Sequence, residues 1–426
     1  MQSIEVMTMA DVDIHLKPFD GNQKVGQKRH QLPHHTARLT AQNNKHTMSY
    51  HPDATEAISL TMPLRNASYS FDGMHPLFQM NLPEGALREA IERTTAKQYG
   101  SDDLTLLTIL GNHQIGRLVY SFKDQTLSPQ SDGQLTLEAL LSHDDAQLFS
   151  QLLTRYAQTS GVAGVQPKVL MDIKSRLTMN TEQYIVKSWG AAYPELGCNE
   201  YVCMHIAKKA GLNVAETFLS DNGKLLISKR FDLDVLDTNA VDGKGAAMGF
   251  EDFCVLQAKG TREKYDGSIE QCANTVRHFV SAEHLADDLA DLYKLTLLNV
   301  RLRNGDAHLK NMGIRYDGLK DYHENQTPMC SRKLAPIFDI VSTVPYLPND
   351  TMALTLSGSK RWPKRKVLHN FARQHCLLTQ KQITQIEEQV DNAIHSSFPL
   401  LDKLQQEHKG FEEVGDAMRK VFGLAL

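Results

Sequence analysis

Residues 285–303 constrain the fold more than any other part of the sequence. Their leucines recur at steps of three and four residues, which is the spacing of a helix buried on one side. Residues 304–311 follow directly and are mostly polar, with the sequence Asn-Gly-Asp-Ala-His-Leu-Lys-Asn. A buried helix that runs into such a loop predicts a packed helical region that presents polar side chains for binding or chemistry.

The rest of the chain divides into three regions by its local patterns. Residues 1–125 alternate short β-type runs with helix-like segments and predict an N-terminal α+β subdomain. Residues 126–240 predict a strand-rich nucleotide-binding lobe with a glycine-rich loop, and residues 241–426 an all-helical C-terminal lobe. The strands expected are 48–50, 58–62, 116–121, 169–173, 184–187 and 224–231; the helices are 83–91, 102–111, 135–156, 199–210, 285–303, 380–396 and 401–422.

Composition excludes several classes of protein. The formal net charge of −4 over 426 residues lacks the basic excess of proteins that coat nucleic acid or anionic membranes. No run of about 18 apolar residues is present, so we expect no transmembrane helix. The six cysteines form no C-x-x-C pair, which disfavours a zinc ribbon or a disulfide framework. Reduced thiols and a cytoplasmic protein fit this pattern better.

The polar loop contains a spacing that phosphoryl transfer can use. Asp306 and Asn311 form D-x-x-x-x-N, and Asp339 ends an apolar run further on. One carboxylate can orient the attacking hydroxyl, while a carboxylate and an amide oxygen hold Mg²⁺ against the phosphates. On this interpretation Asp306 is the catalytic base, and Asn311 and Asp339 are metal ligands. The spacing alone occurs often by chance, and without further context a helix cap at Asp306 with a surface asparagine at 311 is the favoured explanation.

Upstream segments occur in the order found in kinases. Lys187 ends an apolar strand, as does the kinase lysine that reaches the ATP phosphates, and Glu200 on the next helix could pair with it. A glycine-rich segment, residues 160–168, precedes that strand, where a phosphate-covering loop would lie. Lys229 and Phe231 follow where a hinge between lobes could meet adenine. A surface lysine at 187, a flexible turn at 160–168 and a core phenylalanine at 231 are the alternatives.

Together these segments resemble the HipA family of toxin kinases from bacterial type II toxin–antitoxin systems. The resemblance covers nearly the whole chain. The matching segments are 25–26, 46–50, 58–64, 78–84, 106–111, Gly116, 162–168, 199–201, 230–232, 248–253, 305–311 and 338–340. The resemblance implies an α+β, two-lobed protein-kinase-like fold with a mostly helical C-terminal lobe.

The resemblance also implies an activity and its residues. It implies an ATP- and Mg²⁺-dependent serine/threonine kinase with Asp306 as base and Asn311 and Asp339 on the metal ion. The candidate ATP-binding residues are Lys187, Gly161, Val162, Ala163, Gly164, Lys229, Phe231, His308 and Lys310. Family members phosphorylate aminoacyl-tRNA synthetases, notably glutamyl-tRNA synthetase, which halts translation and favours dormancy and persistence. Similar proteins are bound by a HipB-like helix-turn-helix antitoxin that also represses the operon, so operator DNA is an expected indirect partner.

The chain departs from the family in its glycine-rich loop. Family members are similar in having a serine there that is autophosphorylated to switch the kinase off. In this chain Gly161 holds that place, and Ser160 and Thr159 lie one and two residues earlier. Ser160 is therefore the candidate autophosphorylation site, although its phosphate would point differently. A second departure is Lys229, where a relative carries an acid.

Two other functions remain open at this point. The chain could be a HipA-like pseudokinase or a corepressor that acts through the antitoxin and DNA without catalysis. It could also bind nucleic acid through the basic run 361–366, Arg-Trp-Pro-Lys-Arg-Lys, whose cations and aromatic ring suit phosphate and base contacts. A solvated loop before the last helices explains that run equally simply.

Overall fold

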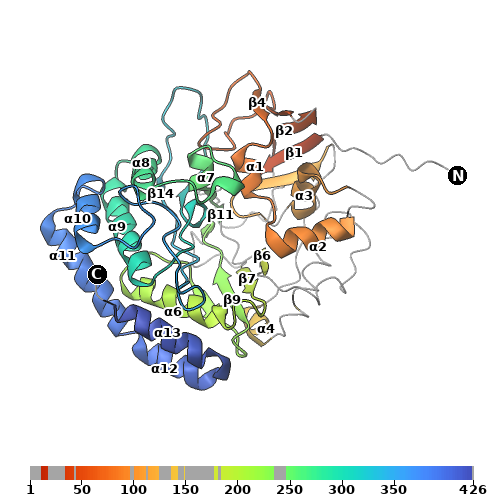
Figure 1. The fold of residues 1–426 in the computed structure, drawn as a ribbon. Helices are drawn as coiled ribbons and strands as arrows, with labels where there is room; N and C mark the ends of the chain where they lie inside the picture. Colours follow the sequence, from red (N-terminus) through yellow and green to blue (C-terminus); the bar gives the residue numbers. More distant parts are fainter. Residues whose placement is uncertain are drawn as a thin grey trace, which may run out of the picture. The chain divides into compact units, whose positions relative to one another are not determined.

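A computed structural model describes most of the chain (Figure 1). The described residues are 11–17, 34–42, 45–95, 100–111, 114–123, 136–142, 148, 177–180, 184–234 and 246–424. Residue contacts divide the chain into two compact units. Unit 1 consists of residues 1–186, 230–251 and 315–330, and unit 2 of residues 187–229, 252–314 and 331–426. Three of the five boundaries fall inside the strands β7 (Tyr184–Ser188), β12 (Gly249–Asp252) and β13 (Gly313–Tyr316), and the other two lie between residues 229 and 230 and between residues 330 and 331.

Unit 1 is built on a five-stranded antiparallel sheet in the order β4-β3-β2-β1-β5. Strand β1, between β2 and β5, is buried along almost its whole length, and α3 packs on β1 and β5. Asp102 caps the N-terminus of α3, and Gly111 ends it as the sequence predicts. The elements of unit 1 are β1 (Asp11–Leu16), β2 (His34–Gln42), β3 (Lys45–Tyr50), β4 (Tyr69–Asp72), α1 (Pro76–Met80), α2 (Gly85–Thr95), α3 (Asp103–Leu110), β5 (Leu118–Phe122), α4 (Leu137–Ser142), β6 (Leu177–Asn180), β10 (Leu233–Asp234) and β11 (Ala246–Ala247).

The strand predicted for residues 58–62 is wrong. This segment forms turns and a local bridge between Ser59 and Met62 instead of joining a sheet. The cause is the buried carboxylate of Glu251, which accepts hydrogen bonds from the Ser59 hydroxyl at 2.9 Å and the Leu60 amide at 2.7 Å. The Tyr316 hydroxyl donates to the same carboxylate at 2.7 Å. A side chain thus takes the backbone donor that a strand partner would otherwise satisfy.

Unit 2 is mostly helical and is centred on the long helix α9. The helices α8, α10 and α11 pack on α9, while α6 packs on α11 and α12. Figure 1 shows α12 and α13 side by side along α6. The elements of unit 2 are α6 (Leu196–Lys209), β8 (Thr217–Leu219), β9 (Leu225–Lys229), α7 (Phe253–Leu256), η2 (Thr261–Glu263), α8 (Ile269–Phe279), α9 (Leu285–Arg301), η3 (Leu309–Asn311), β14 (Arg332–Leu334), α10 (Arg365–Gln374), α11 (Gln380–His395), α12 (Phe398–Glu407), η4 (Lys409–Phe411) and α13 (Glu412–Phe422).

The C-terminal helix pair differs from the prediction of one helix over residues 401–422. The structure has two helices, α12 and α13, separated by the short turn η4. Gly410 lies in that turn, where an added Cβ would come within 2.7 Å of Glu195 Oε1. A larger residue at position 410 would have to displace the end of the Glu195 side chain.

Short strands also occur between the helices of residues 241–426, so this region is mostly rather than wholly helical. The strands there are β11, β12, β13 and β14. All six cysteines are free thiols. Among the described residues, no helix combines the length and the apolar character that crossing a bilayer requires.

Candidate active site

The loop after α9 is held in shape by its own polar groups. Arg303 follows the helix with φ of 54°, in the left-handed region, which turns the chain away from the helix axis. The buried side chain of Asn304 then donates to Asn299 Oδ1 at 2.9 Å and accepts from the Asp306 amide at 3.1 Å. These two bonds fix where the Asp306 backbone begins relative to α9.

The five-residue separation of Asp306 and Asn311 brings the two residues into direct contact. Asn311 Nδ2 donates to the Asp306 carbonyl oxygen at 2.9 Å, and the His308 amide donates to the same oxygen at 2.8 Å. Because its amide nitrogen is used in this way, Asn311 presents its amide oxygen as the atom that a hard cation would take. The D-x-x-x-x-N spacing is therefore structural as well as chemical.

Gly305 is required for this loop to close. Its amide donates to Thr343 Oγ1 at 2.9 Å. An added Cβ would collide with the Asp350 carboxylate and lie 2.7 Å from the Thr351 carbonyl oxygen. Only glycine allows the loop of residues 304–311 and the 343–351 segment to approach this closely.

Asp339 is placed by an extended segment that pairs with the chain after α6. The Ile337 amide donates to the Asn213 carbonyl at 2.8 Å, and the Ala215 amide donates to the Ile337 carbonyl at 2.9 Å. Asp339 itself has φ of 63°. A non-glycine residue in this region costs free energy, and such residues occur often at functional sites.

The ammonium group of Lys187 joins this site to α6. Its Nζ lies 2.6 Å from Glu200 Oε1 and 2.8 Å from Asp339 Oδ1. The side chains of Lys187, Glu200 and Asp339 are only 7%, 1% and 12% exposed. The sequence-based pairing of Lys187 with Glu200 is thus present, and the contact with Asp339 was not foreseen.

A reciprocal pair of hydrogen bonds fastens α6 to the segment after Asp339. Asn199 Nδ2 donates to the Ser342 carbonyl at 2.9 Å, and the Ser342 amide donates to Asn199 Oδ1 at 2.8 Å. Both residues are fully buried. The helix that carries Glu200 and the segment that carries Asp339 therefore behave as one piece.

One small hollow in unit 2 collects the candidate metal ligands. Its lining includes Asn311, Asp339, His308 and Phe338. An amide oxygen and a carboxylate facing one hollow, with a buried lysine on the carboxylate, are a donor set that fits Mg²⁺ bound to phosphate oxygens. Asp306 lies beside this hollow through its contact with Asn311, and its side chain is 32% exposed.

Sequence reasoning missed Tyr265, which contacts the candidate base directly. The Tyr265 hydroxyl donates to Asp306 Oδ1 at 2.7 Å, and the tyrosine ring meets the His308 ring edge-on, with centroids 5.1 Å apart. His308 Nε2 lies 3.9 Å from the same carboxylate oxygen. Tyr265 precedes Asp306 by 41 residues, in a stretch of turns with no periodic pattern, so no local signal could have found it.

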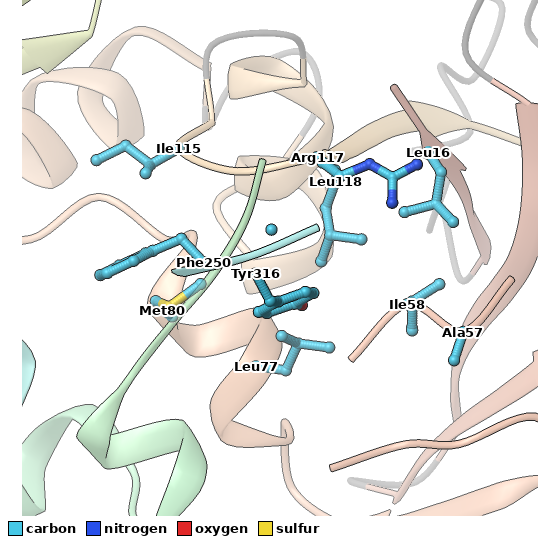
Figure 2. Close-up of a pocket in the computed structure, with 11 residues that line it drawn as sticks. Leu16, Ala57, Ile58, Leu77, Met80, Ile115, Arg117, Leu118, Phe250 and Tyr316 are labelled. Carbon is cyan, nitrogen blue, oxygen red and sulfur yellow. The ribbon is translucent and has the colours of Figure 1, made fainter. Parts of the chain in front are cut away.

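A second hollow, in unit 1, has a different character (Figure 2). Its lining is mostly apolar and includes Leu77, Leu118 and Phe250. The single charged lining residue, Arg117, is paired with Glu56 through both guanidinium nitrogens of its fork. This hollow offers no set of oxygen ligands comparable with that around Asp339.

Comparison with known proteins shows which family the chain belongs to. Residues 160–398 match the family model described as the HipA-like C-terminal domain. Residues 33–121 match the model of the HipA N-terminal domain. The chain belongs to the HipA family.

The relatives of this HipA-family chain share less than a third of their aligned residues with it. It is 28% identical to "Putative kinase Y4dM" of Sinorhizobium fredii over 310 residues, which cover 67% of this chain and 66% of the relative. It is 30% identical to "Putative kinase Y4mE" of the same organism over 315 residues, covering 68% and 70%. The HipA protein of the Shewanella oneidensis MR-1 toxin–antitoxin system, solved with HipB and operator DNA, superposes with a TM-score of 0.60. That superposition has 17% identity and covers 97% of this chain and 100% of that one. The likeness confirms the predicted α+β, two-lobed HipA-like fold.

Three other residues of the HipA-family chain that are predicted to bind ATP differ in how far they are buried. Lys229 is exposed at the end of β9, and Lys310 is half-buried on η3. Phe231 is buried in unit 1, edge-on to Phe250 at 5.1 Å, as a core residue would be. A role for it at adenine stays a prediction. The loop residues Ser160, Gly161, Val162, Ala163 and Gly164 lie outside the described residues.

Proposed function

We propose that this HipA-family protein is an ATP- and Mg²⁺-dependent serine/threonine protein kinase. The observation that carries the proposal is the convergence of Lys187, Asn311 and Asp339 next to Asp306 within one compact unit. The names of the two rhizobial relatives, both given as putative kinases, support the same activity. Four groups from three separate segments of the chain lie together and have the chemistry that phosphoryl transfer requires.

Each residue has a definite role in this proposal. Asp306 orients the acceptor hydroxyl and takes its proton as the hydroxyl oxygen bonds to the γ-phosphorus of ATP, while the bond to ADP breaks. Asn311 and Asp339 would hold Mg²⁺, which supplies charge neutralisation at the phosphate oxygens when it is bound. Lys187 contacts phosphate oxygens, and His308 and Lys310 supply further polar groups within the loop that carries Asp306.

The biological setting follows as a further part of the proposal. We expect a cytoplasmic toxin that phosphorylates a translation factor such as an aminoacyl-tRNA synthetase, with glutamyl-tRNA synthetase the first to test. A HipB-like antitoxin would neutralise it and bring it to operator DNA. The Shewanella HipA protein solved together with HipB and operator DNA supports this partnership. Autophosphorylation would fall on Ser160, because Gly161 occupies the usual serine position.

The experiment compares wild type with Asp306→Asn, using radiolabelled ATP, Mg²⁺ and a bacterial lysate. We expect labelled protein bands with wild type and at least a roughly 100-fold loss with Asp306→Asn, because general-base catalysis contributes about 10²–10⁴-fold. Asp266→Asn is a matched control, since Asp266 is an exposed acid in the same unit. If wild type labels nothing, or both variants label equally well, the protein is a pseudokinase or corepressor rather than a kinase.

Phosphoproteomics on cells that express the same variants would then name the substrate. Sites that are phosphorylated with wild type and absent with Asp306→Asn are substrates. A phosphate on Ser160 in the wild-type protein would support self-modification at the shifted position. If the kinase is active while Thr159 and Ser160 remain unmodified, any regulation by autophosphorylation involves another site.

A further inference from the structure

The carboxylate of Asp306 is held by one side chain from a distant part of unit 2. Tyr265 Oη donates to Asp306 Oδ1 at 2.7 Å, a short bond to an acceptor that is only partly exposed. The tyrosine ring also packs edge-on against His308, which belongs to the same loop as Asp306. The hydroxyl and the ring thus contact the catalytic loop at two points.

The backbone of Tyr265 is fixed from two sides. Lys360 Nζ donates to the Tyr265 carbonyl at 3.1 Å, and the Leu309 amide of the catalytic loop donates to the carbonyl of Lys264 at 3.1 Å. Because the carbonyl groups on both sides of the Tyr265 Cα atom accept hydrogen bonds, the residue does not move freely, although it is 38% exposed.

A hairpin stiffens this attachment. The Met352 amide donates to the Lys360 carbonyl at 2.9 Å, which closes the hairpin over residues 352–360. The hairpin also pairs with the start of α8, because the Thr355 amide donates to the Gly267 carbonyl at 3.0 Å and the Ile269 amide to the Thr355 carbonyl at 2.9 Å. Lys360 therefore reaches Tyr265 from a rigid support rather than from a free loop.

We infer that Tyr265 is a positioning residue for Asp306 in phosphoryl transfer. Its hydroxyl binds Oδ1 and so directs Oδ2 toward the acceptor hydroxyl, whose proton Asp306 takes. Tyr265 keeps its own proton throughout. A carboxylate on a short side chain can otherwise rotate, and a misplacement of about 1 Å can cost about 10²-fold in rate. The inference rests on the proposed kinase function.

The alternative is that Tyr265 only packs against His308. The two roles differ in what removal of the hydroxyl does, because Tyr265→Phe keeps the ring and its contact with His308. A packing role predicts an unchanged enzyme, whereas a positioning role predicts slower chemistry with unchanged nucleotide binding.

The test is steady-state kinetics on the full chain with ATP, Mg²⁺ and the acceptor protein that wild type labels. For Tyr265→Phe we expect kcat to fall about 5- to 50-fold while the KM for ATP changes less than about twofold. The melting temperature should stay within about 1 °C of wild type. Tyr193→Phe is the matched control, because Tyr193 is an equally exposed tyrosine of unit 2 that is 41% exposed and contacts Tyr346 instead.

Three outcomes would separate the possibilities. An active wild type with an unchanged kcat in Tyr265→Phe would overturn the inference and leave the kinase proposal intact. A fall in kcat accompanied by a clear fall in the melting temperature would also overturn it, since the two together indicate a structural role. A wild type that labels no protein would defeat the proposed function itself, and the inference with it.

Discussion

At the scale of single residues, the ammonium group of Lys187 between Glu200 and Asp339 is the most informative contact of the site. One buried cation faces the buried carboxylate of Glu200 and the mostly covered carboxylate of Asp339, so the trio has a formal charge of −1. An excess negative charge out of water is unfavourable unless another positive charge approaches. The trio therefore favours the binding of a cation at Asp339, which agrees with the proposed magnesium site.

Glu200→Gln should weaken both the fold and the site. The change removes one charge partner of Lys187 and leaves the lysine bound to Asp339 alone, which lowers the negative charge that attracts a cation. We expect a loss of about 1–3 kcal/mol in the free energy of unfolding and about a tenfold fall in kinase activity. Urea unfolding and the labelling assay would measure the two effects. Unchanged activity would show that the pair is not part of the catalytic site.

Gly305→Ala should be far more damaging than its size suggests. The added methyl group meets the Asp350 carboxylate and the Thr351 carbonyl, so the catalytic loop must shift. We expect a loss of about 1–3 kcal/mol of stability and more than a tenfold loss of activity. Gly423→Ala is the control, because its added Cβ would make only ordinary contacts, at 3.5 Å or more. Similar behaviour of the two variants would contradict the close approach described for Gly305.

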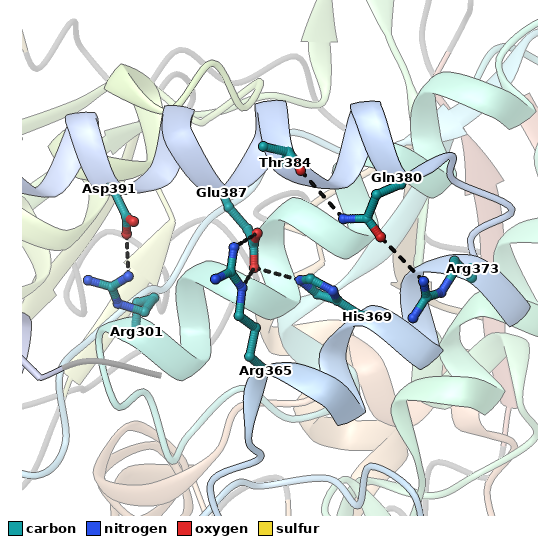
Figure 3. A network of polar contacts seen from close by, with 8 residues as sticks. All are labelled: Arg301, Arg365, His369, Arg373, Gln380, Thr384, Glu387 and Asp391. Carbon is teal, nitrogen blue, oxygen red and sulfur yellow. Dashed lines mark hydrogen bonds and ion pairs between the residues drawn. The ribbon is translucent and has the colours of Figure 1, made fainter.

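At the scale of secondary structure, α9, α10 and α11 are joined by a network of polar contacts (Figure 3). Glu387 on α11 accepts hydrogen bonds from Arg365 at 2.6 and 3.0 Å and contacts His369 at 2.9 Å. Arg301, at the end of α9, pairs with Asp391 one turn along α11. Burial alone would raise the pKa of Glu387, but the hydrogen bonds from Arg365 and His369 bring it below its usual value.

The depressed pKa of Glu387 predicts a pH-dependent contribution to stability. A carboxylate with a lower pKa in the folded state stabilises the fold above its unfolded pKa of about 4.3, and the contribution is lost as the pH falls through the folded value. We expect Glu387→Gln to lose about 2 kcal/mol at pH 7, with the difference from wild type closing below about pH 4. Urea unfolding between pH 3 and 8 measures it. Glu388→Gln, an exposed neighbour, should show no such difference.

Sequence patterns predicted the regular helices better than the segments whose structure depends on residues distant in sequence. Residues 285–303 and 380–396 have a local period that their neighbours in space do not override, and α9 and α11 follow closely. The failure at residues 58–62 comes from Glu251, which is distant in sequence. Tyr265 was not predicted for the same reason, because it is distant in sequence from Asp306. The contact of Asp306 with Asn311 could be predicted from their five-residue spacing, and the pairing of Lys187 with Glu200 from the order of strand and helix along the chain.

At the scale of the whole molecule, the chain passes repeatedly between its two units. Residues 230–251 and 315–330 belong to unit 1, although their neighbours in sequence belong to unit 2. The predicted division at residues 125 and 240 follows composition along the chain, and composition does not reveal such returns. Neither unit is a single stretch of sequence that could be cut out unchanged.

Binding of ATP with Mg²⁺ should stabilise the whole protein. A ligand that binds only the folded state at about 100 times its Kd adds about 2.7 kcal/mol, so we expect the melting temperature to rise by a few degrees. EDTA should abolish most of the rise, and Asp339→Asn should reduce it. ATP alone and Mg²⁺ alone serve as controls in a thermal unfolding assay. An equal rise without Mg²⁺ would remove the metal ion from the proposal.

The reciprocal hydrogen bonds between Asn199 and Ser342 have a consequence for regulation. Many switches work by swinging a helix out of an active site, which here would mean rotating α6 and withdrawing Glu200 from Lys187. Such a rotation would first break two fully buried hydrogen bonds and leave their donors and acceptors without water, at a cost of about 1–3 kcal/mol for each unsatisfied group. The contacts of Lys187 with Glu200 and Asp339 are thus formed before any ligand binds. We therefore expect regulation to act on the access of ligands to this site rather than on its assembly.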